Sequence, residues 1–355
     1  MRLLALTRYE RLGSSSRVRF YQYLPHLTSQ GMEVVTAPFF TDDYVRDLYA
    51  GHRASLKTVL GAYLKRLSVL TRRRSFDLLW VEKELFPWLP AWLETLFHSP
   101  AVPYVVDYDD AVFHRYDLHA SVLVRALLRH KIERVMHHAA LVIAGNEYIA
   151  ERAVHAGARN IEQLPSVVDV GQYAIAEPSF DPVFRVGWIG SPVTAPYLDL
   201  VRGAFGQLSQ ESRVNLTLIG SGNVQPFPHA QTEILPWSEE IELRMSRKFD
   251  VGIMPLVDGP FERGKCGYKL IQYMASALPV IASPVGVNRQ IVEPEVNGYL
   301  AHSPEDWLAA LRTLRDDVIK RKMMGQAGRR KAEQKYNLQV TAPRLLHLLS
   351  SLPKT

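Results

Sequence analysis

The stretch from Gly259 to Gly286, GPFERGKCGYKLIQYMASALPVIASPVG, decides the fold. It has the pattern of a glycine-interrupted basic loop, a short helix and a buried strand that ends in a second glycine loop. Apolar residues of Tyr268–Ala277 fall on one helical stripe, and Pro279–Ala282 is a short apolar run typical of a buried parallel strand. This order predicts one α/β unit of a parallel sheet.

The loop and helix start within this stretch favour an anionic ligand. Gly264 and Gly267 leave the backbone free to approach a ligand, and Lys265 and Lys269 flank the predicted helix start. Free N–H groups at a helix start, together with nearby cations, suit a phosphate group. We therefore expect a nucleotide-linked donor here; the alternative is that both lysines belong to a solvated surface.

Composition limits the class of protein. A chain of 355 residues with 47% hydrophobic and 22% charged residues is long enough for two globular domains. Its single cysteine, Cys266, excludes an internal disulfide framework and fits a reducing compartment. Because no apolar run is long enough to span a bilayer and the start lacks a secretory signal, we expect a cytoplasmic protein.

The net charge of +6 favours an anionic partner, such as a nucleotide phosphate, a nucleic acid or lipid headgroups. The basic clusters lack the interleaved aromatic residues or helix–turn–helix spacing typical of nucleic-acid binding. We therefore expect no nucleic-acid partner.

Alternation of strands and helices predicts a doubly wound α/β domain over residues 1–180. Its strands are expected at Arg2–Thr7, Glu33–Ala37, Asp77–Glu82, Pro103–Asp107, Leu141–Ala144 and Ile161–Leu164, and its helices include Val18–Gln30, Trp88–Phe97 and Ser121–His138. Glu177–Pro182 has the composition of a linker.

The pattern restarts in a second domain, expected over 181–335, with a C-terminal helix over 336–355. Its further strands are expected at Phe184–Ile189, Val214–Ile219 and Asp250–Met254, Thr194 is a predicted helix N-cap, and helices are expected at Pro304–Arg315 and within Val318–Leu352. Two such domains place a ligand in a cleft at the carboxyl ends of their strands.

Three clusters at predicted strand ends are candidate ligand sites. Gly13-Ser14-Ser15-Ser16 precedes a helix that carries Arg17 and Arg19, and it suits a phosphate or sugar cradle or a plain N-cap. Gly220-Ser221-Gly222 follows a strand and is either a ligand loop or a turn.

The acidic run Asp107, Asp109 and Asp110 allows a metal site, a general base or hydroxyl acceptor, and helix capping. No second acidic cluster converges on it, so we favour substrate binding or base chemistry and expect no metal. His114 lies nearby and either polarises a hydroxyl or is structural.

Two basic amphipathic stretches also allow two interpretations. Leu56–Leu70 and Leu123–Val135 each combine an apolar stripe with several Lys and Arg residues. Packing on the sheet explains both stripes, and attachment to anionic lipid on the inner face of a membrane explains their uniform positive charge.

The run LIQYMASALPVIASPVGVNRQIVEPEVNGYLA, residues 270–301, resembles the donor-domain signature of the family 4 retaining glycosyltransferases. Further landmarks occur in family order: LPSVVDVGQY at 164–173, LIGSG at 218–222 and FDVGIMPL at 249–256, with YERLGSSSRVRFYQYLPHL near the start. The resemblance covers nearly the whole chain, and it implies a GT-B fold, in which two Rossmann-like doubly wound domains face a cleft.

The resemblance also implies an activity: transfer of a sugar from a nucleotide-sugar donor to a hydroxyl acceptor with retention, in polysaccharide or glycolipid assembly. The donor is expected to be UDP- or GDP-linked, the acceptor a glycan or lipid-linked molecule, and no cofactor is required. Expected catalytic residues are Asp109, Asp110, Lys265 and Lys269. Expected donor-binding residues are Gly190, Ser191, Gly220, Gly222, Glu262, Gly264, Gly267, Tyr268 and Gln272. Expected acceptor-binding residues are Gly13, Ser14, Arg17 and His114.

The chain departs from the family pattern in ways that define a subgroup with the motif GKCxxKLxQYMA. The family has two glutamates eight positions apart where this chain has Gly264 and Gln272, so Glu262 is a candidate replacement for the first. The family's Arg and Lys after the first strand of the second domain are absent, which leaves Lys265 and Lys269 to neutralise a diphosphate. Asp109 or Asp110 stands where the family has a histidine, and Asn288 and Glu293 lie in the following loop and helix.

These departures keep a second class of function open: a catalytically silent nucleotide-sugar-binding or scaffold protein of the same fold. A sugar-nucleotide epimerase of the same shape would need acidic and histidine landmarks that the sequence lacks.

Overall fold

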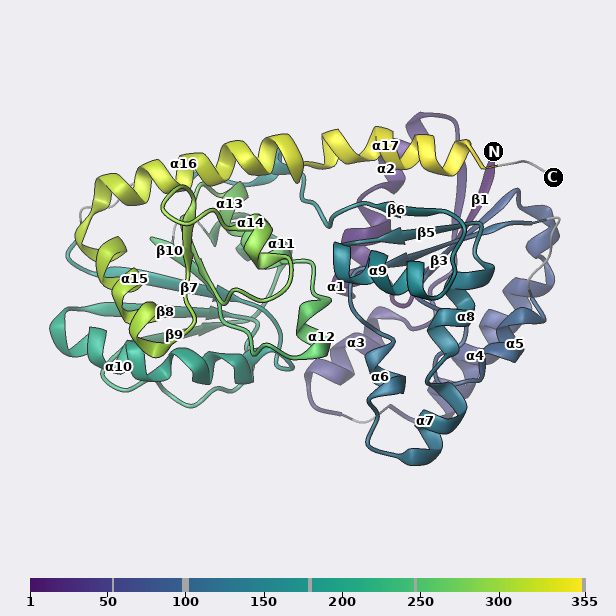
Figure 1. Cartoon of the computed structure of the whole chain (residues 1–355), viewed down its shortest axis with the longest axis horizontal. Helices are drawn as coiled ribbons and strands as arrows, with labels where there is room; N and C mark the ends of the chain where they lie inside the picture. Colours follow the sequence, from purple (N-terminus) through teal and green to yellow (C-terminus); the bar gives the residue numbers. More distant parts are fainter. Residues whose placement is uncertain (53, 98–101, 178–180, 246–247, 353–355) are drawn as a thin grey trace. The chain divides into compact units, whose positions relative to one another are not determined.

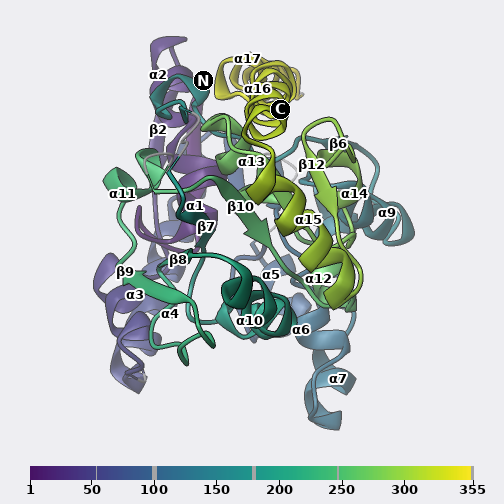
Figure 2. The same cartoon turned by 90° about the vertical axis from the view of Figure 1, so that its left-hand side faces the viewer.

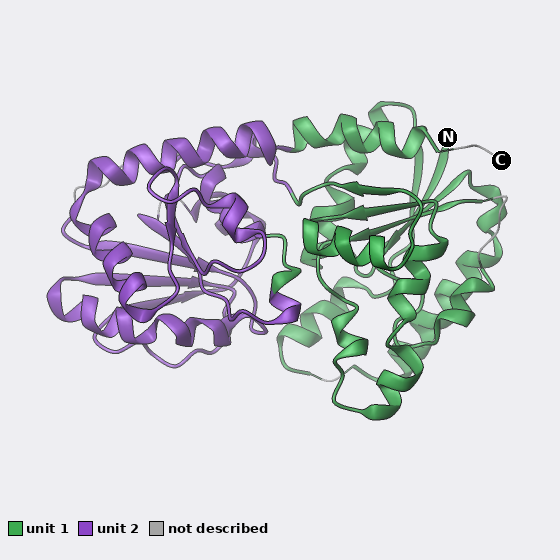
Figure 3. Ribbon diagram, viewed as in Figure 1, with its two compact units in different colours: residues 1–166, 263–266, 338–355 green, residues 167–262, 267–337 purple. Residues whose placement is uncertain are grey.

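A computed structural model describes residues 1–52, 54–97, 102–177, 181–245 and 248–352. The chain forms two compact units, shown in different colours in Figure 3. Unit 1 contains Met1–Ser166, Arg263–Cys266 and Leu338–Thr355, and unit 2 contains Val167–Glu262 and Gly267–Asn337. The fold is therefore α/β with two doubly wound units, and the short segment Arg263–Cys266 belongs to unit 1 although unit 2 flanks it in sequence.

Unit 1 is built on a parallel sheet of six strands in the order β2-β1-β3-β4-β5-β6. The strands are β1 Arg2–Leu6, β2 Glu33–Thr36, β3 Leu78–Glu82, β4 Tyr104–Tyr108, β5 Leu141–Ala144 and β6 Ile161–Gln163. Strands β3, β4 and β5 are buried along their whole length, as expected for apolar strands with helices on both faces. The register pairs Glu82 with Asp107 and Tyr108 with Ala144, so these strands end at one common edge.

The helices of unit 1 cover this sheet (Figure 1). They are α1 Ser14–Ser16, the turn Arg17–Tyr21, α2 Leu24–Ser29, α3 Asp42–Tyr49, α4 Leu56–Thr71, α5 Ala91–Thr95, α6 His114–Asp117, α7 Val122–Leu128, α8 Lys131–His138, α9 Glu147–His155 and α17 Leu338–Ser350. Aromatic packing anchors the first helical turns, since Phe20 stacks on Trp80 of β3 with ring centroids 4.0 Å apart.

Unit 2 repeats the architecture with a parallel sheet in the order β12-β11-β10-β7-β8-β9 (Figure 2). Its strands are β7 Phe184–Ile189, β8 Val214–Ile219, β9 Gln231–Leu235, β10 Val251–Met254, β11 Val280–Ala282 and β12 Gly298–Leu300. Its helices are the 3-10 helix η4 Ala195–Val201 and the α-helices α10 Arg202–Glu211, α11 Glu239–Leu243, α12 Pro260–Arg263, α13 Tyr268–Ala275, α14 Asn288–Ile291, α15 Pro304–Asp316 and α16 Val318–Lys335. The buried core includes Trp188, Phe205 and Trp307.

The predicted C-terminal helical tail is two helices that belong to different units. Helix α16 packs on α13 in unit 2, where a side chain at Gly325 would lie 1.9 Å from the Ala277 carbonyl oxygen. Helix α17 belongs to unit 1, where Thr341 lies 3.1 Å from the Tyr23 hydroxyl and Arg344 pairs with Glu162 at 2.8 Å. The sequence alone could not assign this tail to a unit.

Several predicted elements differ in extent from the observed ones. The predicted helix Ser121–His138 is two helices, α7 and α8, and the predicted helix Trp88–Phe97 is limited to α5. Thr194 precedes a helical turn but does not cap it, because its hydroxyl bonds Ser191 instead. The predicted linker Glu177–Pro182 includes residues 178–180, which lie outside the described residues. Among the described residues, no helix is both long and apolar enough to cross a membrane.

Candidate functional site

The carboxyl edge of the unit 1 sheet gathers charged side chains from two neighbouring strands. Strand β3 ends in Glu82, and Lys83 and Glu84 follow it directly. Strand β4 contains Asp107, and Asp109 and Asp110 follow it. Ligands bind at this edge in open parallel sheets, so these six positions are where chemistry is expected.

The serine loop after β1 reaches the same edge. Gly13 is required by close packing, because a side chain there would lie 2.3 Å from Tyr9 Cβ. The Ser15 hydroxyl donates to Asp109 Oδ2 at 2.6 Å, and the Ser16 hydroxyl donates to Glu82 Oε2 at 2.6 Å. The loop therefore supports the acidic residues through Ser15 and Ser16, whereas Ser14 is exposed.

The predicted acceptor residue Arg17 is buried beside this loop, and its guanidinium donates to the Arg11 carbonyl at 3.4 Å. Arg19 lies deeper and pairs with Asp107 at 2.8 Å, while a second nitrogen donates to the Leu164 carbonyl at 2.9 Å. Burial raises the pKa of Asp107 to about 6, although the Arg19 guanidinium opposes that rise.

Lys83 is a residue of this edge that sequence reasoning missed. Its ammonium nitrogen lies 2.8 Å from Asp109 Oδ1 and donates to the Ser15 hydroxyl at 3.0 Å. Its backbone has φ +65°, a left-handed conformation that a lysine rarely adopts. Strained backbone of this kind clusters at functional positions. The sequence contained a signal for Lys83, because the charged run Glu82-Lys83-Glu84 stands at the end of a predicted strand, as the aspartate run does.

Asp109 and Asp110 are adjacent in sequence, but their surroundings shift their pKa values in opposite directions. Burial would raise the pKa of Asp109, but the Lys83 ammonium and the hydrogen bonds from Lys83 and Ser15 outweigh burial and lower it. Burial raises the pKa of Asp110. The Lys265 ammonium offsets this rise only in part, and repulsion from the Asp109 carboxylate adds to it. Neighbouring carboxylates with opposed pKa shifts are suited to different roles, one kept ionised and one able to take up a proton.

The segment Arg263–Cys266 completes this part of unit 1. Asn146 holds it: the amide nitrogen donates to the Gly264 carbonyl at 2.8 Å and to the Lys265 carbonyl at 3.1 Å. A side chain at Gly264 would lie 2.4 Å from Ala111 Cβ, so this glycine permits contact with the loop after β4. Lys265 Nζ is thereby placed 3.9 Å from Asp110 Oδ1.

Cys266 is buried in the hydrophobic core of unit 1. Its sulfur lies 3.4 Å from the Asn146 amide nitrogen, and burial raises the pKa of the thiol well above its ordinary value. The Asn146 contacts were not predictable from sequence spacing, since more than a hundred residues separate the partners.

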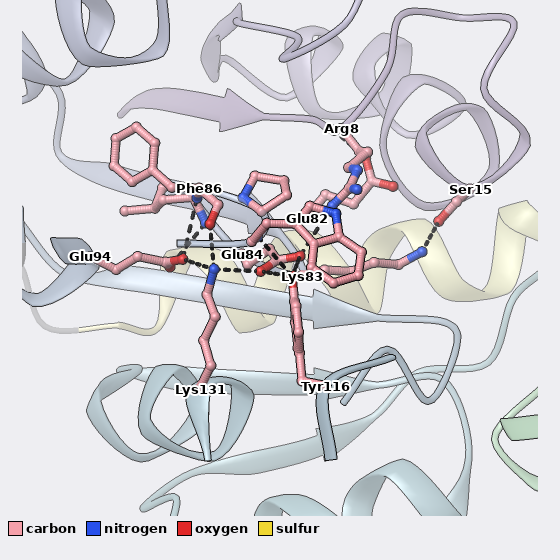
Figure 4. Close-up of polar contacts among 12 residues, drawn as sticks. Arg8, Ser15, Glu82, Lys83, Glu84, Phe86, Glu94, Tyr116 and Lys131 are labelled. Carbon is pink, nitrogen blue, oxygen red and sulfur yellow. Dashed lines mark hydrogen bonds and ion pairs between the residues drawn. The ribbon is translucent and has the colours of Figure 1, made fainter. Parts of the chain in front are cut away.

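A buried charge network lies behind the edge (Figure 4). The Lys131 ammonium lies 2.7 Å from Glu84 Oε2 and 2.9 Å from Glu94 Oε1, and Figure 4 shows it pointing between the two carboxylates. Glu84 also accepts from Tyr116 at 2.9 Å and pairs with Arg8 at 3.1 Å. This network connects α8 and α5 to the residue that follows Lys83.

The two carboxylates around Lys131 differ in pKa direction. Burial would raise the pKa of Glu84, but Lys131 and Arg8 together lower it. Burial raises the pKa of Glu94, because the attraction of the Lys131 ammonium is too weak to offset the loss of hydration of the Glu94 carboxylate. Both remain hydrogen-bonded, since Glu94 accepts from the backbone nitrogens of Leu85 at 3.0 Å and Phe86 at 3.2 Å.

His114, expected to bind the acceptor, uses both ring nitrogens within unit 1. Nδ1 lies 2.8 Å from Asp117 and Nε2 lies 2.8 Å from the Tyr148 hydroxyl. Asp117 is paired in turn with Arg152 at 2.9 Å. An acceptor hydroxyl would have to displace one of these partners to reach the ring.

Unit 2 presents the glycine loops at the ends of β7 and β8. Gly190 follows β7, and a side chain there would lie 2.8 Å from Lys269 Nζ. The same ammonium donates to the Thr194 hydroxyl at 3.3 Å and lies 4.3 Å from the Trp188 ring centroid. Ser191 shapes this loop, since its backbone nitrogen donates to the Thr194 hydroxyl at 3.2 Å. Lys269 is thus a cation held over a glycine–serine loop, a geometry suited to phosphate oxygens.

Gly220 and Gly222 form the neighbouring loop in left-handed backbone conformations, with φ +74° and +66°. A side chain at Gly220 would lie 2.5 Å from the Gly190 carbonyl oxygen, so the two loops touch and only glycine fits. The structure therefore brings together the predicted residues Gly190, Ser191, Gly220, Gly222 and Lys269.

The remaining donor-side residues surround the start of α13. Gly267 precedes the helix with φ +65°, and a side chain there would lie 2.3 Å from Ile291 Cδ1. Glu262 accepts a hydrogen bond from the Tyr197 hydroxyl. Tyr268 is the first residue of α13 and is half-buried. Asn288 is buried and donates to the Ser283 carbonyl at 3.0 Å, while Glu293 is exposed and pairs with Lys331 at 2.5 Å.

Gln272 lies on α13 and is buried in a polar network rather than exposed. Its amide nitrogen lies 3.5 Å from the Tyr173 hydroxyl, which donates to Glu242 at 2.8 Å. The Trp237 indole donates to the other Glu242 oxygen at 2.8 Å. The Tyr173–Glu242–Trp237 cluster was not predicted, because Tyr173 lies 69 residues before Glu242 in sequence.

Unit 2 also contains a cavity of about 370 Å³ past the ends of β10, β11 and β12. Its lining is mainly apolar, with Leu256, Val285 and Trp307, and it includes Arg289 and His302. It does not include the glycine loops or Lys269. Over the described ranges, no three His, Cys, Asp or Glu side chains gather to hold a metal ion.

Lys265 and Lys269, predicted to act together, belong to different units. Lys265 faces Asp110 in unit 1, and Lys269 faces the loop after β7 in unit 2. The two lysines therefore have different immediate partners.

Comparison with known proteins finds a family model and solved structures that are similar to this chain. Residues 184–317 match the model of the family described as glycosyl transferases group 1. Two solved structures share the fold. Anabaena Alr3699/HepE in complex with UDP-glucose is 16% identical with a TM-score of 0.74, and the match covers 99% of this chain and 100% of that one. Sucrose-phosphate synthase from Thermosynechococcus elongatus is 16% identical with a TM-score of 0.74, and the match covers 99% of each chain. The fold is GT-B.

Spore coat protein SA from Bacillus subtilis (strain 168) is 34% identical over 76 residues, which are 21% of this chain and 20% of that protein. The match thus spans about a fifth of that relative's length.

Proposed function

We propose that the chain transfers a sugar from a nucleotide-sugar donor, UDP- or GDP-linked, to a hydroxyl acceptor with retention of configuration. The observation that carries this proposal is Lys269, held over the Gly190–Thr194 loop within the segment that matches group 1 glycosyltransferases. The Anabaena Alr3699/HepE structures in complex with UDP and with UDP-glucose support a nucleotide-sugar donor.

The donor half of the reaction is assigned to unit 2. Lys269 neutralises the diphosphate, and the loops at Gly190–Ser191 and Gly220–Gly222 let the backbone approach it. Electrostatic stabilisation of the departing diphosphate lowers the barrier because its negative charge grows as the bond to the sugar breaks. Glu262, Gly267, Tyr268 and Gln272 are assigned to the sugar and nucleoside part of the donor.

The acceptor half is assigned to unit 1, with Gly13, Ser14 and Arg17 as binding residues. The bond from the anomeric carbon to the diphosphate oxygen breaks, and a bond from that carbon to the acceptor oxygen forms. Asp110, whose pKa is raised, takes up the proton of the acceptor hydroxyl, and Lys265 stabilises the carboxylate before transfer. Asp109 stays ionised beside Lys83 and positions the loop.

Isothermal titration calorimetry with UDP tests the donor assignment. Lys269→Met is expected to weaken UDP binding by about tenfold to a hundredfold, because charge-assisted hydrogen bonds to phosphate contribute on the order of 1.5–3 kcal/mol. Lys248→Met is the matched control, since Lys248 is an exposed lysine of unit 2 paired with Glu233. Equal UDP affinity in wild type and Lys269→Met would refute the assignment.

A second candidate is a nucleotide-sugar-binding protein without turnover. Gly264 and Gln272, in place of the family's two glutamates, favour it, and so does the burial of Gln272. It predicts UDP binding that depends on Lys269 with neither transfer nor hydrolysis of a labelled donor. The assembly of polysaccharide or glycolipid is the biological setting proposed for the active enzyme.

A further inference from the structure

Helix α4 of unit 1 has two apolar faces, and only one of them is packed. Ala62, Arg66 and Leu70 point into the unit and are buried. Leu56, Leu60, Leu64 and Leu67 occupy successive turns of the other face, and 88%, 61%, 57% and 38% of their surfaces are exposed. A single exposed leucine is ordinary, but four in one strip form the contiguous apolar surface that marks an interaction site.

The helix is fixed in place by contacts on its inner face and at its start. The Ser55 side chain accepts from the Thr58 backbone nitrogen at 3.1 Å and caps the helix. The Arg66 guanidinium donates to the Thr7 carbonyl at 2.7 Å, and the Tyr63 hydroxyl donates to the Pro87 carbonyl. The leucine strip is therefore presented by a formed helix.

The charge around the strip has one sign. From Leu48 to Phe76 the sequence contains no Asp or Glu and seven Lys or Arg residues. Lys57, Lys65, Arg72 and Arg74 are exposed on or beside the helix. The partner must therefore combine an apolar interior with negative charge.

We propose that the leucine strip of α4, Leu56, Leu60, Leu64 and Leu67, lies in the interface of an anionic lipid bilayer. A helix of 16 residues is about 24 Å long, and with the leucines on one side and the cations beside them it fits the plane of a membrane rather than its thickness. The leucines enter the acyl boundary, and the lysines and arginines pair with anionic headgroups.

Charge complementarity favours lipid over a second copy of this chain. Two copies joined through this face would oppose cation to cation with no carboxylate in the strip to pair with them. Helix α7 also exposes Val122, Leu123 and Leu127, but Arg125 is the single Lys or Arg within it, whereas α4 contains Lys57, Lys65 and Arg66. Helix α4 is thus the more cationic of the two.

Vesicle sedimentation tests this proposal with the full chain and without a donor. Phosphatidylcholine vesicles with about one third phosphatidylglycerol are compared with pure phosphatidylcholine vesicles. Wild type is expected to bind the anionic vesicles, and added salt is expected to weaken that binding. The variant Leu56→Gln/Leu60→Gln/Leu64→Gln is expected to lose about tenfold or more of its partitioning.

A matched control comes from unit 2. Ile319 and Met323 lie one turn apart on α16, with exposures of 71% and 64%, and Ile319→Gln/Met323→Gln is expected to partition like wild type. A second strip variant, Lys57→Glu/Lys65→Glu, is expected to lose binding to anionic vesicles while the leucines remain. All variants are compared by thermal unfolding, and since the changed side chains are exposed, their transitions are expected to match wild type.

Three results would overturn the proposal. They are absence of wild-type binding to anionic vesicles, equal binding by the three-leucine variant, and a wild-type dimer in solution that this variant dissociates. The last would assign the strip to a second copy. The proposal goes beyond the transfer reaction. Vesicle sedimentation tests lipid binding by the leucine strip, and UDP affinity by calorimetry tests the donor site, so failure of either proposal leaves the other standing.

Discussion

The Lys83 ammonium lies 2.8 Å from Asp109 Oδ1, and Lys83 takes a left-handed backbone conformation there, with φ +65°. The pair joins the loops after β3 and β4 at the carboxyl edge of unit 1. Because Asp109 is thereby kept ionised, its neighbour Asp110 faces a fixed negative charge, which adds to the effect of burial on the pKa of Asp110. The ion pair thus lowers the pKa of Asp109 and, through the charge on Asp109, adds to the rise in the pKa of Asp110 that burial causes.

Lys83→Met is expected to reduce transfer by on the order of a hundredfold, the effect typical of a disturbed acid–base group. Without the cation, burial raises the pKa of Asp109, which must stay ionised to position the loop, so the lower limb of the pH–rate profile is set by Asp109 and moves to higher pH. Lys83→Arg, which keeps the charge, is the control and should retain more activity. A Lys83→Met profile that falls in rate without moving along the pH axis would contradict this role.

Asp107 predicts a pH dependence of stability. Its pKa is raised to about 6 in the folded chain, whereas an unfolded aspartate titrates near pH 4. Between about pH 4 and 6 the folded state therefore holds the proton that the unfolded state has released. The contribution of Asp107 to the free energy of unfolding should fall by about 2–3 kcal/mol as the pH rises through this window.

Denaturant unfolding of wild type and Asp107→Asn at several pH values measures this contribution. The difference in unfolding free energy, wild type minus variant, should decrease from pH 4 to pH 6 and then level off. A difference that is flat or increases over that window would show that the pKa of Asp107 is not raised.

Lys131→Met is expected to destabilise the chain by about 3–5 kcal/mol, because two buried carboxylates, Glu84 and Glu94, lose their shared cation. Thermal unfolding measures the loss, with Lys248→Met as the exposed control. Adding Glu94→Gln to Lys131→Met removes the carboxylate that, unlike Glu84, does not also pair with Arg8, and this should recover part of the stability. If the double variant is no more stable than Lys131→Met, the network is not held by charge compensation.

Cys266 reports on the docking of Arg263–Cys266 in unit 1. The thiol is buried and its pKa is raised, so it should react with a disulfide reagent far more slowly in the folded chain than in denaturant. The signal is unambiguous because the chain has one cysteine. Asn146→Ala removes the hydrogen bonds to this segment and is expected to accelerate the reaction; rapid labelling of native wild type would contradict the burial.

Hydrophobic pattern alone predicted most of the sheet framework. Phe184–Ile189 and Val214–Ile219 have the predicted bounds because each is a mostly apolar run followed directly by a glycine, Gly190 or Gly220. Strands β9 and β12 were not predicted: Gln231–Leu235 is mostly polar, and Gly298–Leu300 has only three residues. Short or half-exposed strands depend on pairing with a neighbour, which a local pattern does not contain.

The candidate site was harder to predict than the fold. The aspartate run was found because it ends a strand, but the same rule was not applied to Lys83. Lys265 and Lys269 were grouped because both flank the predicted helix start, whereas Asn146 holds the Lys265 backbone in unit 1. The apolar residues of α4 also formed a single stripe in sequence, and the structure divides them between a packed and an exposed face. Contacts between distant residues decide such cases.

Turnover of nucleotide sugars, followed by proton NMR, tests the central claim most directly. Wild type is incubated with UDP- and GDP-linked α-sugars and a panel of glycan and lipid-linked acceptors, with Asp110→Asn as the comparison. We predict release of the nucleoside diphosphate with a product of retained anomeric configuration, and a rate at least about a hundredfold lower for Asp110→Asn at unchanged UDP affinity. A product of inverted configuration, or UDP binding without turnover of any donor, would contradict the account.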